Sequence, residues 1–290
     1  MTFLGIEGDL ATREGAKVVL LPVPHDATTS FHAGARRGPD AVLVASHHIE
    51  EYDEELGREP WACGIHVAEA VAPAAGEPSW LPAELVDAVE RRVSALVDDQ
   101  KVVITLGGDH TVAVGAGRAH AARYEGLTFL QIDAHADMRD TYDGSPLSHA
   151  CVARRLSEVG EVVQVGVRSI STEGAAHLRG LGREPFWAQD IAACPDDGWM
   201  DEVVARLGPT VYVTFDVDGL DPSIMPATGT PEPGGLGWWQ TLRLLRRVAA
   251  ARRVVGADVC ELLPTDGLHA CDVLVARLVY KMIGYFVPVE

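Results

Sequence analysis

Short apolar runs recur along nearly the whole chain, separated by polar turns and amphipathic stretches. The runs are rich in β-branched and aliphatic residues without alternation, which is typical of strands buried on both faces of a parallel sheet. The strands predicted in this way are Lys17–Val23, Gly64–Val67, Val102–Leu106, Leu127–Leu130, Glu161–Val167, Pro185–Ala188, Thr210–Phe215 and Arg253–Val259.

Amphipathic stretches with apolar residues three and four positions apart lie between these runs and predict helices. The predicted helices are Ala41–Ile49, Glu84–Val97, Ala150–Val159, Ser171–Leu181, Trp238–Arg252 and one that begins near Leu268. A further helix is expected after the Gly107-Gly108 turn, with Thr111 as its cap. The alternation predicts a single three-layer α/β/α domain over residues 1–290, with a mostly parallel sheet of about eight strands.

Composition narrows the function classes. Of 290 residues, 47% are hydrophobic, and the net charge is 24 − 42 = −18. An acidic chain is a poor candidate for binding nucleic acid or an anionic membrane, but it suits a cationic substrate. Five widely spaced cysteines without a C-x-x-C motif predict neither a disulfide framework nor a thiolate zinc site. The first residues lack a secretory h-region, so we expect a cytoplasmic protein.

Chemically active residues follow four of the predicted strands. His110 follows the predicted strand Val102–Leu106, and Asp133, His135 and Asp137 follow Leu127–Leu130. Asp216 and Asp218 follow Thr210–Phe215, and Glu261 follows Arg253–Val259. Because parallel strands present their carboxyl ends at one edge of a sheet, residues far apart in sequence converge there. Taken singly, a histidine after a glycine turn or an Asp-x-Asp before glycine is more often loop chemistry. Together they predict a metal site.

Two imidazoles and four carboxylates without a thiolate favour a hard divalent ion such as Mn²⁺ over structural Zn²⁺. The number of ligands suits two ions about 3.5–4 Å apart, which need bridging ligands. Asp133 and Asp216 come first in their motifs and are the expected bridges.

Three segments resemble the signatures of the ureohydrolase family, which contains arginase and agmatinase. They are Gly107-Gly108-Asp109-His110, Asp133–Asp137 and Thr214–Pro222. The likeness extends to Gly34–Pro39 and to Ala227–Gly235 and spans nearly the whole chain. The resemblance implies an arginase-like fold, a hydrolase of linear amidines, and a homo-oligomer, trimeric or hexameric.

The resemblance also implies roles for particular residues. One Mn²⁺ of each subunit would be held by His110, Asp133, Asp137 and Asp216, and the second by Asp133, His135, Asp216 and Asp218. His149 would act as acid/base or proton shuttle, and Glu261 would bind the guanidinium, with Thr230 beside the substrate. The implied reaction is attack of a metal-bridging hydroxide on the guanidinium carbon, with Asp137 among the catalytic residues.

The loop Met138–Ser148 is expected to select the substrate. Arginases use an asparagine-bearing loop here to bind the α-amino and α-carboxyl groups of arginine, and this chain contains no asparagine. The stretches Pro24–Ser30 and Gly34–Pro39 also resemble the agmatinase branch of the family, so we favour agmatine, which gives putrescine and urea. An agmatine with an N1-aminopropyl extension, which gives spermidine, is the alternative. Asp140 or Asp143 is a candidate for attracting the distal cation of either substrate.

Other activities stay open at this point. Arginase, guanidinobutyrase and formimidoylglutamase activities would use the same metal site on different substrates. From other classes, a single-zinc deacetylase of related fold would leave Glu261 and a second pair of aspartates surplus, and a binuclear phosphoesterase would need further histidine and asparagine ligands. A non-catalytic relative would be expected to lack at least one ligand, and this chain lacks none.

Overall fold

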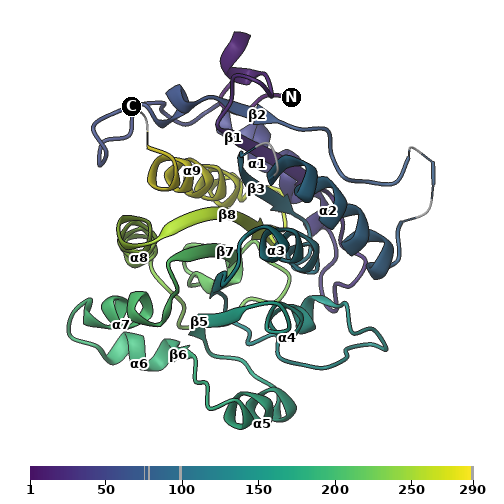
Figure 1. Cartoon of the computed structure of the whole chain (residues 1–290), viewed down its shortest axis with the longest axis vertical. Helices are drawn as coiled ribbons and strands as arrows, with labels where there is room; N and C mark the ends of the chain where they lie inside the picture. The colour runs from purple at the N-terminus through teal and green to yellow at the C-terminus, as the bar shows by residue number, and fades with distance from the viewer. Residues whose placement is uncertain (75, 78, 98–99, 289–290) are drawn as a thin grey trace.

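The computed structural model describes residues 1–74, 76–77, 79–97 and 100–288. Within them, eight parallel strands form one sheet in the order β2-β1-β3-β8-β7-β4-β5-β6 (Figure 1). Their bounds are β1 Val18–Val23, β2 Ile65–Val67, β3 Val102–Gly107, β4 Thr128–Ile132, β5 Glu161–Val167, β6 Phe186–Trp187, β7 Thr210–Asp216 and β8 Arg253–Cys260. The α/β domain and its parallel sheet of about eight strands are therefore confirmed.

Helices cover both faces of this sheet. The helices are α1 Gly38–Ser46, α2 Pro82–Val97, α3 Val112–Arg123, α4 Val152–Leu156, α5 Thr172–Gly180, α6 Ala188–Ala193, α7 Gly198–Arg206, α8 Trp238–Ala251 and α9 His269–Phe286. In β1, Val18 and Leu20 join the core under α1, α8 and α9, whereas Val19 and Leu21 join the core under α2 and α3 (Figure 1). Alternate side chains of one strand thus enter two separate cores, and this makes three layers.

The order of the strands places the predicted site. Strands β3, β8, β7 and β4 are neighbours in the middle of the sheet, although they are far apart along the chain. They are the four strands whose carboxyl ends carry the metal-ligand candidates and Glu261. Because every pairing is parallel, those ends lie at one edge.

The structure corrects three local expectations. The predicted helix over Ala150–Val159 is shorter, with a 3-10 turn at His149–Cys151 and a helix only over Val152–Leu156. Helices α6 and α7 were not expected, although the buried residues of α7, Trp199, Met200 and Val203, have helical spacing. Thr111 precedes α3, but its side chain accepts no capping hydrogen bond, and its φ of −54° is already helical. Its hydroxyl instead lies 2.9 Å from the hydroxyl of Thr28.

The turn after β3 depends on the absence of a side chain at Gly108. A Cβ there would lie 1.8 Å from the carbonyl oxygen of His25, in the loop after β1. We expect Gly108→Ala to lower the free energy of unfolding by about 3 kcal/mol or more, because backbone must move. Gly180→Ala is the matched control, since a Cβ at Gly180 meets nothing within 4 Å. Equal urea-unfolding midpoints for the two variants would contradict this account of the turn.

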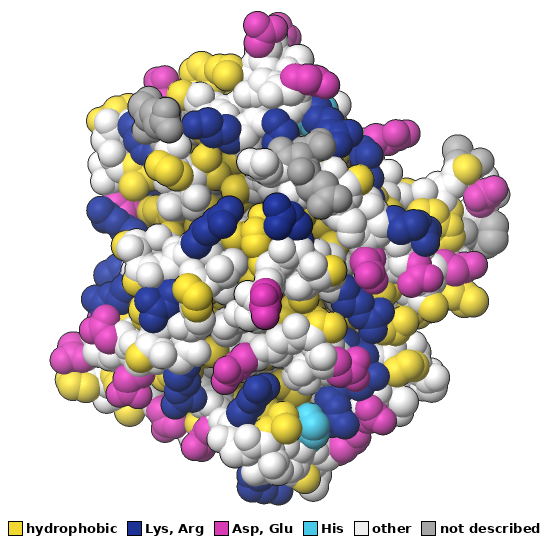
Figure 2. Space-filling model, viewed as in Figure 1, with side chains coloured by type: hydrophobic (Ala, Val, Ile, Leu, Met, Phe, Trp, Pro, Cys, Tyr) yellow, Lys and Arg dark blue, Asp and Glu magenta, His cyan; other side chains and the backbone are white. Residues whose placement is uncertain are grey.

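On the face that Figure 2 shows, basic and acidic side chains are interspersed. This face therefore does not present the continuous basic patch that is typical of nucleic-acid binding. In the described part of the chain, no helix is both long and apolar enough to cross a bilayer. The cytoplasmic location and the domain limits at residues 1 and 290 stay predictions.

Candidate metal centre

The six predicted metal ligands meet at the carboxyl edge of the central strands. Nδ1 of His110 lies 3.3 Å from Asp133 Oδ2, 3.3 Å from Asp137 Oδ2 and 3.4 Å from Asp216 Oδ2. Nδ1 of His135 lies 2.9 Å from Asp218 Oδ2 and 3.7 Å from Asp133 Oδ1. Convergence of these side chains is what the strand-end argument predicts.

Asp133 belongs to both halves of the cluster. His110, Asp133 and Asp137 form one group with ligand-atom spacing suitable for an ion, and Asp133, His135 and Asp218 form another. The two oxygens of Asp133 therefore face different histidines, as a bridging ligand requires. Asp216 reaches the first group through Oδ2, while its Oδ1 accepts the backbone N–H of Asp218 at 2.9 Å.

The hydrogen bonds of His110 show why a cation fits here. Thr214 Oγ1 donates to Asp258 Oδ1 at 2.9 Å, so its single hydrogen is used and it accepts from Nε2 of His110 at 2.8 Å. A hydrogen on Nε2 leaves the Nδ1 lone pair directed at three carboxylates, and Nδ1 is buried without a hydrogen-bond partner. Lone pair and carboxylates repel each other unless a proton or a metal ion lies between them.

Burial makes this cluster of charges unfavourable in the absence of cations. Asp133 is fully buried, and Asp216 and Asp218 are nearly so. Burial, and then the charge of Asp133, raises the pKa of Asp137 to about 7, and burial with Asp218 raises the pKa of Asp216 well above its ordinary value. The pKa of Asp133 is lowered, because its interactions with the imidazoles of His110 and His135 outweigh its burial. Divalent ions would remove the conflict.

Two residues of the site have backbone angles that side chains other than glycine rarely adopt. Asp137 has φ +49° and Glu261 has φ +67°. Such left-handed residues cost roughly 1–3 kcal/mol and cluster at functional sites. Each is the last of the predicted site residues that directly follow its strand. The cost is consistent with a role beyond folding.

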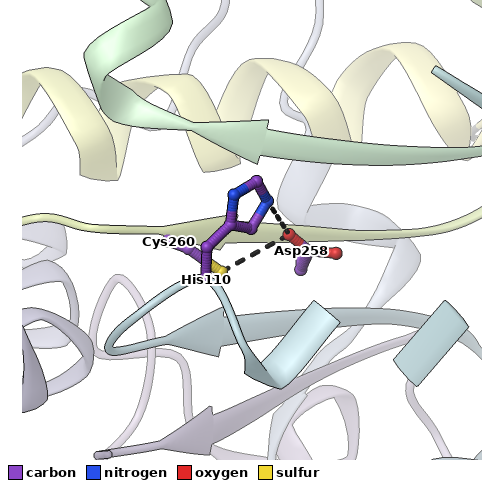
Figure 3. A group of neighbouring side chains, drawn as sticks. All are labelled: His110, Asp258 and Cys260. Atoms are coloured by element: carbon purple, nitrogen blue, oxygen red, sulfur yellow. Dashed lines mark hydrogen bonds and ion pairs between the residues drawn. The ribbon is translucent and has the colours of Figure 1, made fainter. Parts of the chain in front are cut away.

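A third group, His110, Asp258 and Cys260, is a scaffold rather than a metal site (Figure 3). Cys260 Sγ donates to Asp258 Oδ1 at 3.4 Å, and burial followed by the charge of Asp258 raises the pKa of the thiol well above its ordinary value. The thiol is therefore protonated in the metal-free protein, where it serves as the donor to Asp258. Asp258, from β8, supports His110 through Thr214.

A cavity of about 220 Å³ opens beside the cluster. The predicted residues His149, Glu261 and Thr230 line it together with the metal-ligand candidates His110, His135, Asp137 and Asp216. Glu261 Oε1 accepts the backbone N–H of His110 at 2.8 Å, and burial raises the pKa of Glu261 well above its ordinary value. A bound guanidinium would compensate that buried carboxylate by pairing with it.

Neither aspartate expected to attract the distal cation lines this cavity. Asp140 instead accepts from Arg155 at 2.9 Å and lies 3.7 Å from Arg154. Asp143 is exposed at a turn with φ +48°. From the same loop, Arg139 and Tyr142 do line the cavity, and the guanidinium of Arg139 lies 5.3 Å from the ring centre of Tyr142.

Several supporting residues were missed in the sequence. Gln131 Nε2 donates to Asp133 Oδ2 at 2.7 Å, and the Gln164 amide in turn donates to Gln131 Oε1 at 2.7 Å. Thr214 and Asp258 orient His110 in the same manner. A polar residue inside an otherwise apolar strand, as at positions 131, 164, 214 and 258, was the available signal.

Comparison with known proteins decides the family. The Arginase family profile matches residues 16–284. The chain belongs to the arginase family. The recognition made from three motifs is thus confirmed, and so is the expectation of a hydrolase of this family. The arginase-family chain is 40% identical over 275 residues to an N(1)-aminopropylagmatine ureohydrolase of Synechocystis sp., covering 93% of this chain and 89% of the relative.

Two other arginase-family proteins show the breadth of the likeness. An agmatinase of Pyrococcus horikoshii is 33% identical over 93% of this chain and 92% of its own length. The crystal structure of the agmatine ureohydrolase of Thermoplasma volcanium superposes with a TM-score of 0.81, at 31% identity, over 96% of this chain and 92% of that chain. The relatives thus act, by name, on guanidino amines.

Proposed function

We propose that this chain is a two-metal ureohydrolase that removes urea from a linear guanidino amine, with agmatine as substrate and putrescine as the second product. The observation that carries the proposal is one cavity that is lined by Glu261, by His149 and by four of the six predicted metal ligands. When bound, two Mn²⁺ ions would supply an ionised water as nucleophile and offset charge that develops in the transition state. The ligand set of nitrogen and oxygen atoms suits that metal.

The chain's own residues would supply binding and proton transfer. The Oε2 atom of Glu261 lies 3.9 Å from the Cβ position at Gly229, so the absence of a side chain there keeps the carboxylate accessible. A planar guanidinium pairs well with such an acceptor. His149 lines the same cavity, and burial lowers its pKa, so that it is neutral near pH 7. A neutral imidazole can take up a proton and deliver it to the departing amine.

A second candidate substrate is the N1-aminopropyl derivative of agmatine. The carboxylates among the residues lining the cavity are Asp137, Asp216 and Glu261, all assigned to metal or guanidinium, and Arg139 adds a positive charge. No carboxylate that lines the cavity is therefore left to bind the distal ammonium of agmatine. This favours a substrate whose amine extends beyond the cavity. Three relatives of 39–40% identity carry the name N(1)-aminopropylagmatine ureohydrolase.

A urea-release screen with the Mn²⁺-loaded protein tests the proposal. We expect kcat/KM for agmatine or aminopropylagmatine to exceed that for arginine by roughly 100-fold, because no asparagine is present to bind an α-carboxylate. The ratio between the two amines decides the tail length. A clear preference for arginine, guanidinobutyrate or formiminoglutamate would overturn the substrate assignment. Metal analysis that finds one ion or none per chain would overturn the two-metal site.

A further inference from the structure

A chain of hydrogen bonds behind His149 joins three loops at the edge of the sheet. Thr28, in the loop after β1, donates both its backbone N–H and its hydroxyl to Asp109 Oδ2, at 2.9 and 3.0 Å. Asp109 is fully buried, and its other oxygen accepts the backbone N–H of Thr111 at 3.2 Å. The carboxylate thus fixes the position of the Thr28 hydroxyl.

The direction of these bonds determines what Thr28 offers to His149. A hydroxyl has one hydrogen, and Thr28 donates it to Asp109 Oδ2, which also accepts the backbone N–H of Thr28. The oxygen of Thr28 is then an acceptor, and it accepts first from the hydroxyl of Thr111 at 2.9 Å. It accepts the backbone N–H of His149 at 3.1 Å and lies 3.3 Å from Nδ1 of the same residue. Ser148 Oγ also lies 3.3 Å from that nitrogen and can accept the same hydrogen.

The opposite edge of the imidazole faces the substrate cavity. Nε2 of His149 lies 3.4 Å from Oγ of Ser30, which lines the cavity, whereas Thr28 does not. The ring of Tyr142 meets the imidazole edge to face, with 5.6 Å between centres and 82° between planes. The imidazole is therefore held from behind by Thr28 and from one side by Tyr142.

We infer that Thr28 is a positioning residue for His149: its oxygen, fixed by Asp109, holds the backbone N–H of His149 and, together with Ser148 Oγ, faces Nδ1, so that the hydrogen of the neutral imidazole stays on Nδ1 and the Nε2 lone pair faces the cavity. This inference rests on the proposed function, in which His149 exchanges a proton with the substrate. Nε2 is then the atom that takes up the proton, and Thr28 acts only through His149. An acid/base residue needs its reactive nitrogen free and its other nitrogen held.

Thr28→Val and Thr28→Ser form the test. Valine keeps the branched shape but removes the hydroxyl, whereas serine keeps the hydroxyl. We expect Thr28→Val to lower kcat about 10- to 100-fold with little change in KM, and Thr28→Ser to restore most of the loss. Thr241→Val is the matched control, because Thr241 is a buried threonine in α8 whose hydroxyl donates to Gly237. Thr28→Ala serves as the second hydroxyl deletion if the valine variant does not fold.

Labelling with diethyl pyrocarbonate gives a second measurement that does not need turnover. Its rate at the His149 peptide, followed by mass spectrometry against pH, reports the ionisation of that imidazole. Burial lowers the pKa of His149, the charge of Asp109 raises it, and His110 and His135 lower it. Removing the Thr28 acceptor withdraws support mainly from the charged form, so the midpoint should move to lower pH in Thr28→Val and return in Thr28→Ser.

The outcomes are distinguishable. If Thr28→Val leaves both kcat and the His149 midpoint unchanged, or changes only KM or the unfolding midpoint, Thr28 is a loop residue and the inference is wrong. If the wild-type protein releases no urea from any guanidino compound, the proposed function is wrong. The labelling midpoint still decides the role of Thr28 in that case.

Discussion

Asp133→Ala is expected to lose both metal ions and all measurable urea release, whereas His149→Ala should keep its metal and lose turnover. Asp133 is fully buried between His110 and His135 and belongs to both ligand groups. Its removal would therefore take one ligand from each of the two groups. His149 belongs to neither group, and general acid/base groups contribute roughly 10²- to 10⁴-fold to rate.

Metal content by emission spectroscopy after dialysis, together with urea release, checks this pair. Asp133→Asn is the matched variant, because it keeps the volume of the side chain and the acceptor for the backbone N–H of His135, at 2.6 Å in the wild type. It separates loss of charge from loss of shape. Equal metal loss in Asp133→Ala and His149→Ala would show that His149 is a structural part of the metal site, contrary to its proposed role.

Stripping the metal with a chelator is expected to make thermal stability fall as the pH rises from about 5 to about 8. In the unfolded chain an aspartate ionises near pH 3.8, whereas burial and Asp133 raise the pKa of Asp137 to about 7 in the folded chain. Between these values the folded state binds the extra proton, so stability decreases with rising pH. Asp216 and Asp218, whose pKa values are also raised, act in the same direction.

The buried His110 also makes the stability of the metal-free protein fall as the pH rises. Carboxylates beside His110 outweigh its burial and raise its pKa well above the ordinary value. That contribution is fully present below pH 6.5 and is lost as the pH rises toward the raised pKa. The lowered pKa of Asp133 acts only at acid pH, below this window. The combined effect is on the order of 3 kcal/mol, or roughly 5–10 °C in Tm.

Thermal unfolding at several pH values, with chelator and with added Mn²⁺, measures this effect. The ions replace the protons at the carboxylates, so the gap in Tm between loaded and stripped protein should widen with pH. Asp216→Asn is the control variant, because a neutral amide cannot ionise and the slope of its stripped form should be shallower. Parallel pH curves for the stripped and loaded protein would contradict the assignment of these carboxylates as metal ligands.

The sequence predicted those parts of the site that depend on where strands end. His110, Asp133 and Asp216 follow apolar runs, and parallel pairing alone brings such positions together. It could not predict contacts between side chains that lie far apart along the chain. The bond from Thr28 to Asp109 spans 81 positions, and the bond from Thr214 to Asp258 spans 44. A threonine at a strand end reads as ordinary turn chemistry until its partner is known.

The same limit explains the errors. Thr111 has the residue type and position of a helix cap, but a tertiary contact to Thr28 takes its hydroxyl. Asp140 has a charge complementary to a cationic substrate, but its carboxylate pairs with the guanidinium of Arg155. In both cases a local rule gave a reasonable answer, and a partner from elsewhere in the fold took the group.

The order of the sheet bears on how the protein is made. Strand β8 is synthesised last of the strands, yet it lies between β3 and β7. Without β8, the pairings of the other strands leave two separate groups, β2-β1-β3, followed by His110, and β7-β4-β5-β6, followed by Asp133 and Asp216. The backbone N–H of His110 finds its acceptor in Glu261, 151 positions later. We therefore expect a chain truncated before Arg253 to leave the two parts of the candidate metal centre unjoined.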